Sequence, residues 1–167
     1  MKPAVTPAPT TNVAAAGKVA RVVELMQVRL ASMRFDSSFG EDPPGEFEMK
    51  QSLTHRFARE VEGDGLLAIV GYRLALEAPE EQQAQPGRPD VEIEAHFQAF
   101  YRVKDLTGLS DVDFDCFAEL NGTLNTYPYW RELVQSMTSR AGLGGIVMPV
   151  WRAQTRKLEP PQLVEGT

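Results

Sequence analysis

The chain contains 167 residues, of which 43% are hydrophobic and 24% are charged, and this composition is that of a globular protein rather than a disordered one. Its formal net charge of −6 argues against nucleic acid or an anionic membrane as the main partner, because either would require a basic patch. A single cysteine, Cys116, excludes an intramolecular disulfide and a thiolate metal cluster.

The ends of the chain differ in composition from the middle. Prolines interrupt the segment MKPAVTPAPTTNVAAAG, so we predict no signal peptide. No apolar run reaches the ~18 residues of a membrane span, so we expect a cytoplasmic protein with no direct membrane insertion. We expect residues 1–12 to form a disordered leader, residues 13–152 to form one domain, and residues 153–167, with Pro160 and Pro161, to form a flexible tail.

Residues 13–39 carry two conflicting patterns. Apolar residues recur at helical spacing over most of this stretch, whereas QVRLASMRFD alternates as a strand does. We predict a helix from about Asn12 to Leu25 and then a strand to about Phe39. A change of face near Ala31 predicts a β-bulge within that strand.

Three further strands are predicted from alternating apolar and polar residues. They lie in EFEMKQSLTHRFAREVEG, LLAIVGYRLALEA and VEIEAHFQAFYRVK, at residues 46–63, 66–78 and 91–104. Gly63 and Gly65 predict a tight turn between the first two, because glycine tolerates a positive φ. Together the four strands predict an antiparallel sheet with one packed face and one wet face.

Two helices are predicted after the sheet. Ser110 and Asp113 resemble a capping box that starts a short helix, and Gly122 is expected to end it. The residues of this helix expected to turn inward are Val112, Cys116, Phe117 and Leu120. In YPYWRELVQSMTSRAGL, Pro128 suits the first turn of a helix and so marks the start of the main helix, and Gly142 suits its carboxy-terminal cap.

The main helix carries one apolar stripe. Its members are Trp130, Leu133, Val134, Met137 and Ala141. Such a stripe predicts packing against the sheet. The predicted fold class is therefore α+β, a four-stranded antiparallel sheet with helices packed on one face.

Enzyme-like patterns are weak. The aspartates of DVDFD, residues 111–115, resemble the start of a calcium loop, but Cys116 and Gly122 stand where that loop needs glycine and glutamate. Cys116 lies on an apolar helical face, and His55 and His96 lie on different strands, which argues against a thiol–imidazole pair. We expect Cys116 to be structural, and we expect no catalysis, metal ion or cofactor.

Two groups of residues fit a binding role instead. Acidic residues recur on the predicted wet face at Glu46, Glu48, Glu60, Glu62, Glu92 and Glu94. They form either a solvated face or a docking surface for a basic partner.

Aromatic and methionine residues gather later in the chain at Tyr127, Tyr129, Trp130, Met148 and Trp151. They suit either core packing or a surface that accepts many partners.

The segment YPYWRELVQSMTSRAGLGGIVMPV resembles SecB, the bacterial protein-export chaperone family. That family opens its main helix with an aromatic–Pro–Tyr–x–Arg–Glu run, followed by a Ser–x–x–x–Arg ending and an extended apolar link that ends near Pro–Val. The matching positions are Tyr127, Pro128, Tyr129, Arg131, Glu132, Ser136, Arg140, Ile146, Met148, Pro149 and Val150. The predicted order of elements before this segment is also that of the family.

The resemblance implies an ATP-independent holdase that binds unfolded polypeptides. It implies a homotetramer, a dimer of dimers, with helices sandwiched between two sheets. The partners would be unfolded preproteins or an antitoxin, with the export motor ATPase in the export branch. Client grooves would follow the sheet, the crossover between the first two strands and the link after the main helix. The implied client-binding residues are Phe39, Phe47, Met49, Leu143, Ile146, Met148 and Trp151.

The sequence departs from the SecB pattern in three places. RAQTRKLEPPQLVEGT has no clear counterpart of the second carboxy-terminal helix, Leu-Asn-Thr stands near the place of a common Cys-Pro-Asn, and the amino terminus is longer. SecB-like chaperones of toxin–antitoxin systems share the longer amino terminus, so general export and a dedicated antitoxin role both stay open. The rival class is a small-ligand or enzymatic domain of a cone-shaped helix-plus-curved-sheet fold, similar to nuclear transport factor two.

Overall fold

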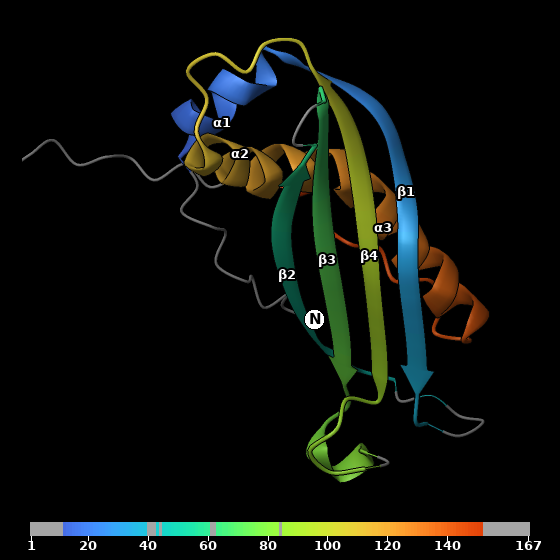
Figure 1. Cartoon of the computed structure of the whole chain (residues 1–167). Helices are drawn as coiled ribbons and strands as arrows, with labels where there is room; N and C mark the ends of the chain where they lie inside the picture. The colour runs from blue at the N-terminus through green and yellow to red at the C-terminus, as the bar shows by residue number, and fades with distance from the viewer. Residues whose placement is uncertain (1–11, 40–42, 44, 61–62, 84, 152–167) are drawn as a thin grey trace, which may run out of the picture.

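The computed structural model describes residues 12–39, 43, 45–60, 63–83 and 85–151. The predicted leader, except Asn12, and the predicted tail lie outside these residues. A long curved sheet is crossed on one face by the helices (Figure 1). The elements in chain order are α1 (Val13–Ala20), β1 (Val23–Ser37), β2 (Glu48–Arg59), β3 (Gly65–Glu77), the 3₁₀ turn η1 (Glu80–Gln82), β4 (Val91–Val103), α2 (Asp111–Phe117), the π-helical turn η2 (Ala118–Gly122) and α3 (Thr123–Arg140).

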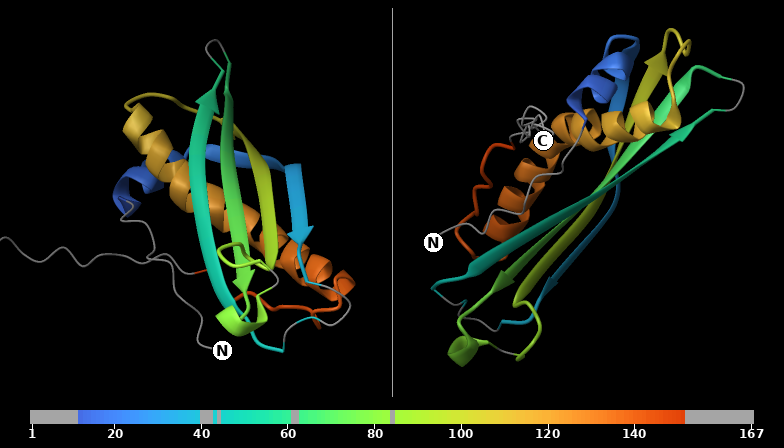
Figure 2. Two further views of the ribbon diagram at one scale, coloured as in Figure 1. Left: turned by 90° about the horizontal axis from the view of Figure 1, so that it is seen from below. Right: turned by 90° about the vertical axis from the view of Figure 1, so that its left-hand side faces the viewer.

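The sheet confirms the predicted fold class. Its four strands run antiparallel in the order β1-β4-β3-β2, so β1 and β2 are the edges. The helices α2 and α3 lie on one face, and the opposite face is free of helices (Figure 2). Alternating burial along β4 matches this arrangement, because odd-numbered residues are buried and even-numbered ones are partly or fully exposed.

The first helix is shorter than predicted, and the first strand begins earlier. The helix α1 ends at Ala20 rather than Leu25, and β1 is paired with β4 from Val23 onward. Hydrogen bonds to a neighbouring strand outweigh the helical apolar pattern of this stretch. The β-bulge near Ala31 is confirmed by a register shift between Leu30 and Ser32, and a second shift at residue 26 was not predicted.

The turn between β2 and β3 needs glycine for a different reason from the one predicted. Gly65 has no positive φ. A Cβ at Gly65 would instead lie 2.7 Å from the side-chain carboxyl carbon of Glu60. Gly65 therefore provides space for the Glu60 side chain rather than a left-handed backbone conformation.

The capping box of α2 is confirmed in detail. The Asp113 carboxylate accepts a hydrogen bond from the Ser110 amide at 2.9 Å, and the Ser110 hydroxyl accepts one from the Asp113 amide at 3.3 Å. Of the residues expected to turn inward, Val112 was wrong, since it is 67% exposed. In its place Phe114 is fully buried against the sheet, beside Phe117.

Gly122 does not end the helix, and Pro128 does not start the next one. Helical backbone continues without a break from α2 through η2 into α3. A Cβ at Gly122 would lie 3.1 Å from the Cβ of Ala68, so this glycine lets the helix approach β3 closely. Pro128 stands inside α3, which is tolerated because the Leu124 carbonyl that loses its donor is on an exposed residue.

The carboxy-terminal cap of α3 is confirmed. Gly142 has a φ of 79°, its amide donates to Ser139, and the Leu143 amide donates to Thr138. This pair of bonds is a Schellman motif, which directs the chain sharply away from the helix axis. The link that follows, residues 143–151, therefore turns back along α3.

The core of the domain lies between α3 and the sheet. Trp130 is fully buried and stacks on Tyr72 of β3 with ring centroids 5.2 Å apart. The Tyr72 hydroxyl lies 2.8 Å from the hydroxyl of Thr126. Phe97 of β4 meets Tyr72 edge-on. Tyr127 and Trp130 of the predicted main helix therefore lie in the core, whereas Tyr129 is 51% exposed.

Candidate polypeptide-binding surface

The seven residues implied as client-binding all contact one hydrophobic core cluster. Met49 and Met148 are buried members of it, and Phe39, Phe47, Leu143, Ile146 and Trp151 are partly buried at its rim. Phe39 and Phe47, on either side of the crossover between β1 and β2, have ring centroids 6.5 Å apart. The fold thus brings together the crossover, the start of β2 and the link. We call the five partly buried residues the rim surface.

The link is held against α3 by three side chains of that helix. The Tyr127 hydroxyl donates to the carbonyl of Pro149 at 3.0 Å, and Arg131 Nε donates to the carbonyl of Met148 at 2.9 Å. Farther along the helix, the hydroxyl of Thr138 accepts from the amide of Ile146 at 2.8 Å. These bonds satisfy polar groups of a segment that joins no sheet. They explain what the Tyr and Arg of the SecB-like motif do in this chain.

Met148 corrects one expectation about this surface. Its position in an irregular segment predicted an available side chain, yet it is 1% exposed. The bonds from Tyr127 and Arg131 fix the link so that Met148 points into the core. Val147 and Val150 point outward instead and are 68% and 65% exposed. Alternation along the link would have found Val147 but not Val150, since Val150 is an even number of residues from buried Met148.

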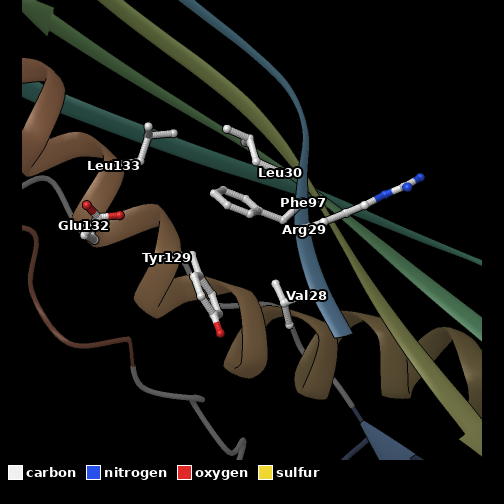
Figure 3. A pocket seen from close by; sticks show the side chains of 7 residues that line it. All are labelled: Val28, Arg29, Leu30, Phe97, Tyr129, Glu132 and Leu133. Carbon is white, nitrogen blue, oxygen red and sulfur yellow. The ribbon is translucent and has the colours of Figure 1, made fainter. Parts of the chain in front are cut away.

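A pocket of about 150 Å³ opens between β1 and α3 (Figure 3). Its apolar walls are Val28, Leu30, Phe97, Tyr129 and Leu133, and the carboxylate of Glu132 and the side chain of Arg29 complete the lining. The sequence did not predict this pocket. The apolar residues of β1 fit both helical and strand spacing, so the faces of this segment could not be assigned from the pattern. Apolar residues of β1 that pair with the buried residues of β4, such as Leu25, Leu30 and Met33, share the face of the sheet that carries the helices.

Exposed apolar residues extend along β1 from this pocket. Leu25, Met26, Leu30 and Met33 are each more than two-fifths exposed. Soluble monomers rarely leave such a row uncovered, so it marks an interaction surface.

A second pocket, of about 200 Å³, lies between α3 and the link. Its lining includes Pro128, Arg131, Gln135 and Val147. It is a polar hollow beside the exposed side of the link.

The tyrosines around the core are not poised for acid–base chemistry. Burial raises the pKa of Tyr72 and of Tyr127, and burial raises the pKa of Tyr101 to about 12. Their hydroxyls hence remain protonated at neutral pH and form hydrogen bonds as neutral groups. Tyr101, for example, accepts a bond from Asn125 at 2.8 Å.

Each aspartate of DVDFD lies beside a different basic side chain. Asp111 pairs with Arg59, Asp113 with Lys18 and its own capping box, and Asp115 lies 3.6 Å from His55. Across the described ranges, no group of His, Cys, Asp and Glu side chains has the arrangement of a metal site.

Cys116 packs at the edge of a second hydrophobic cluster. That cluster is built around Phe114 and Phe117. The hydrogen bonds among described residues join His96 to Ser32 and do not join Cys116 to either histidine. Among the described residues, no hydrogen bond therefore pairs the thiol with an imidazole.

The fold is that of a SecB-like chaperone. A SecB-like chaperone of Mycobacterium tuberculosis, solved in complex with a ChAD peptide from the HigA1 antitoxin, matches this chain with a TM-score of 0.70. The sequence identity is 14%, and the match covers 83% of this chain and 97% of the other. A protein of unknown function from Streptococcus agalactiae matches with a TM-score of 0.38 and 9% identity, over 77% and 97% of the two chains.

Sequence comparison adds no relative. No family model matches the chain, and no curated protein matches it. None of the helices in the described part of the chain has the length and hydropathy of a membrane span.

Proposed function

We propose that this protein is an ATP-independent chaperone that holds unfolded polypeptide in the cytoplasm. The observation that carries the proposal is the fold match to a SecB-like chaperone together with apolar surface left open at two places, the rim surface and the row along β1. An unfolded chain presents scattered apolar side chains, so a receptor for it needs adaptable apolar area rather than a fixed catalytic group. Methionine and aromatic side chains supply that adaptability.

We propose an antitoxin as the dedicated client. The M. tuberculosis protein, which has the same fold, was solved with an antitoxin peptide. Binding to the export motor ATPase is the less supported branch, because the matching structure contains an antitoxin peptide.

The rim surface is proposed to contact the client, with Met49 and Met148 supporting it from below. Phe39, Phe47, Leu143, Ile146 and Trp151 are partly buried, so each keeps some apolar area for a client side chain. Contacts at several of these residues along one client would add through multivalency.

Replacing Ile146 or Phe47 by serine is expected to weaken binding of a fluorescently labelled unfolded client. Loss of one anchor of about 1–2 kcal/mol corresponds to roughly 5- to 30-fold in Kd. Fluorescence anisotropy measures this change. Val112→Ser is the matched control, because Val112 is an exposed apolar residue on α2, away from the rim surface. Equal Kd values for all three variants would remove the rim surface from the binding site.

We propose that the protein forms a homotetramer, a dimer of dimers. The support is the apolar row of the edge strand β1 and the exposed Leu124 and Tyr129 of α3, which a single copy leaves in contact with water. Sedimentation equilibrium at micromolar concentration is expected to give four times the 18.5 kDa mass of one chain. A mass of one chain under these conditions contradicts the proposal.

The rival reading as a small-ligand or enzymatic domain finds less support. Such a domain would enclose a polar pocket between the helix and the curved sheet. In this protein Trp130, Tyr72 and Phe97 fill that space with stacked and edge-on rings.

A further inference from the structure

The sheet has an outer face, which looks away from the helices (Figure 2). Strand pairing places its side chains in rows across the four strands. One row, for instance, runs from Arg29 through Gln98 and Ile69 to Arg56. The rows fall into two halves of different chemistry.

The half near the β3–β4 connection is charged and internally paired. Arg73 contacts both Glu92 and Glu94, and Lys50 pairs with Glu77. Arg34 lies 3.7 Å from Glu92. These ion pairs satisfy much of the charge, but acids outnumber cations in this half, because Asp36 and Glu48 lie on the same face.

In the other half, two neighbouring rows are basic and apolar. Their basic and apolar members, here named the basic–apolar patch, are Arg29, Arg56, Ala58, Leu67, Ile69 and Phe100. The next row, nearest the turn between β2 and β3, carries Glu24, Arg102 and, beside Gly65, Glu60. Leu67, Ile69 and Phe100 are partly exposed, although they lie on the two central strands. The two rows of the patch contain no acidic residue, since their remaining members are Gln27 and Gln98. Acids lie farther along the face on both sides of these two rows.

The two arginines are presented differently. Arg29 points away from α3 (Figure 3), donates from Nε to Gln98 at 2.6 Å, and lies over the ring of Phe100 at 5.0 Å. This holds its guanidinium flat on the patch with other N–H groups free to donate. Arg56 is exposed, and no described residue forms an ion pair or hydrogen bond with it. Both are therefore available to a carboxylate.

The position of the arginines limits what can bind. They lie on the two edge strands, three strand spacings or ~14 Å apart, with Ile69 and its apolar neighbours between them. A binding segment that satisfies both arginines needs carboxylates at two separated points and apolar side chains in the middle. Arginine with an aromatic or aliphatic neighbour is also the composition of energetically dominant interface residues.

We propose that the basic–apolar patch docks an acidic amphipathic segment of a partner protein, separately from the rim surface on the opposite face. Charge complementarity supports this partner over a basic one or an anionic surface, because the paired acids of the neighbouring half would repel a broad anionic surface. The patch would let the protein hold a client on one face and a second protein on the other.

A peptide selection tests the proposal. Displayed random peptides of about 16 residues, which as helices of ~24 Å span both arginines, are selected on the wild-type protein and depleted on Arg56→Glu. The surviving pool is expected to be enriched in acidic residues on both sides of an apolar centre. For a synthesised member, Arg56→Glu is expected to raise the Kd by about tenfold or more, as for one lost charge-assisted contact, and Ile69→Thr is expected to raise it while keeping β propensity.

Two controls separate this result from the proposed client binding. Arg34→Glu makes the same charge change on the same face outside the patch, and Ile146→Ser alters the rim surface; both are expected to leave the Kd of the selected peptide unchanged. The proposal is overturned if the selected pool is not enriched in acidic residues. It is also overturned if Arg34→Glu and Arg56→Glu lose equal affinity for the selected peptide. A change in the oligomeric mass of Arg56→Glu also overturns it, because the occupant would then be a second copy of the chain. Client binding is measured on the same variants, and its result does not depend on whether the selected peptide binds.

Discussion

Replacing Trp130 by alanine is expected to lower the free energy of unfolding by about 3–5 kcal/mol. Trp130 is fully buried at the centre of the core and stacks on Tyr72, so the deletion leaves a large cavity between α3 and β3. For a domain of marginal stability such a loss removes a large share of the total. Urea denaturation followed by circular dichroism measures the change.

Trp130→Phe is the matched control for this prediction. The indole Nε1 makes no hydrogen bond with any described residue, so phenylalanine gives up no polar contact and keeps a ring on Tyr72. Its expected cost is less than about half that of alanine, because only part of the ring volume is lost. Equal costs for the two variants would show that the indole nitrogen, rather than the packed ring, stabilises the core.

Met148→Ser is expected to cost about 2–5 kcal/mol and to detach the link from α3. The side chain is fully buried, and serine would replace it with an unpaired hydroxyl in the core. The backbone carbonyl of Met148 also accepts the hydrogen bond from Arg131 that holds the link on α3. Denaturation gives the free-energy change, and hydrogen exchange at the amide of Ile146 reports loss of its bond to Thr138.

Val147→Ser provides the comparison one residue earlier. Val147 is 68% exposed, so its replacement is expected to change stability by no more than about 0.5 kcal/mol. If Val147→Ser destabilises the protein as much as Met148→Ser does, the placement of the link in this structure is wrong.

Strand alternation made most of the fold predictable. In β2, β3 and β4 the apolar and polar residues alternate without conflict; β3 and β4 were placed within one residue of their bounds and β2 within four. The helix stop at Gly122 was wrong because a glycine can also serve close packing, and that requires knowing that Ala68 lies opposite. The start at Pro128 was wrong because tolerance of an interior proline depends on solvent at the Leu124 carbonyl, which no local pattern records.

The candidate site was predictable in its location and less so in its details. The resemblance to SecB pointed to the crossover and the link, and the structure gathers their residues on one core cluster. Which of them remain accessible depends on long-range bonds such as that from Arg131 to Met148. Nor could alternation alone reveal the apolar row of β1, because its meaning depends on β1 being an edge of the sheet.

Light scattering tests the central claim most directly. Several unrelated unfolded clients and an antitoxin are diluted into buffer without nucleotide, alone and with a stoichiometric excess of the protein. The account predicts that the protein suppresses their aggregation and that Ile146→Ser suppresses it less, with Val112→Ser unchanged. Aggregation of every client and of the antitoxin at the same rate with and without the wild-type protein contradicts the chaperone function.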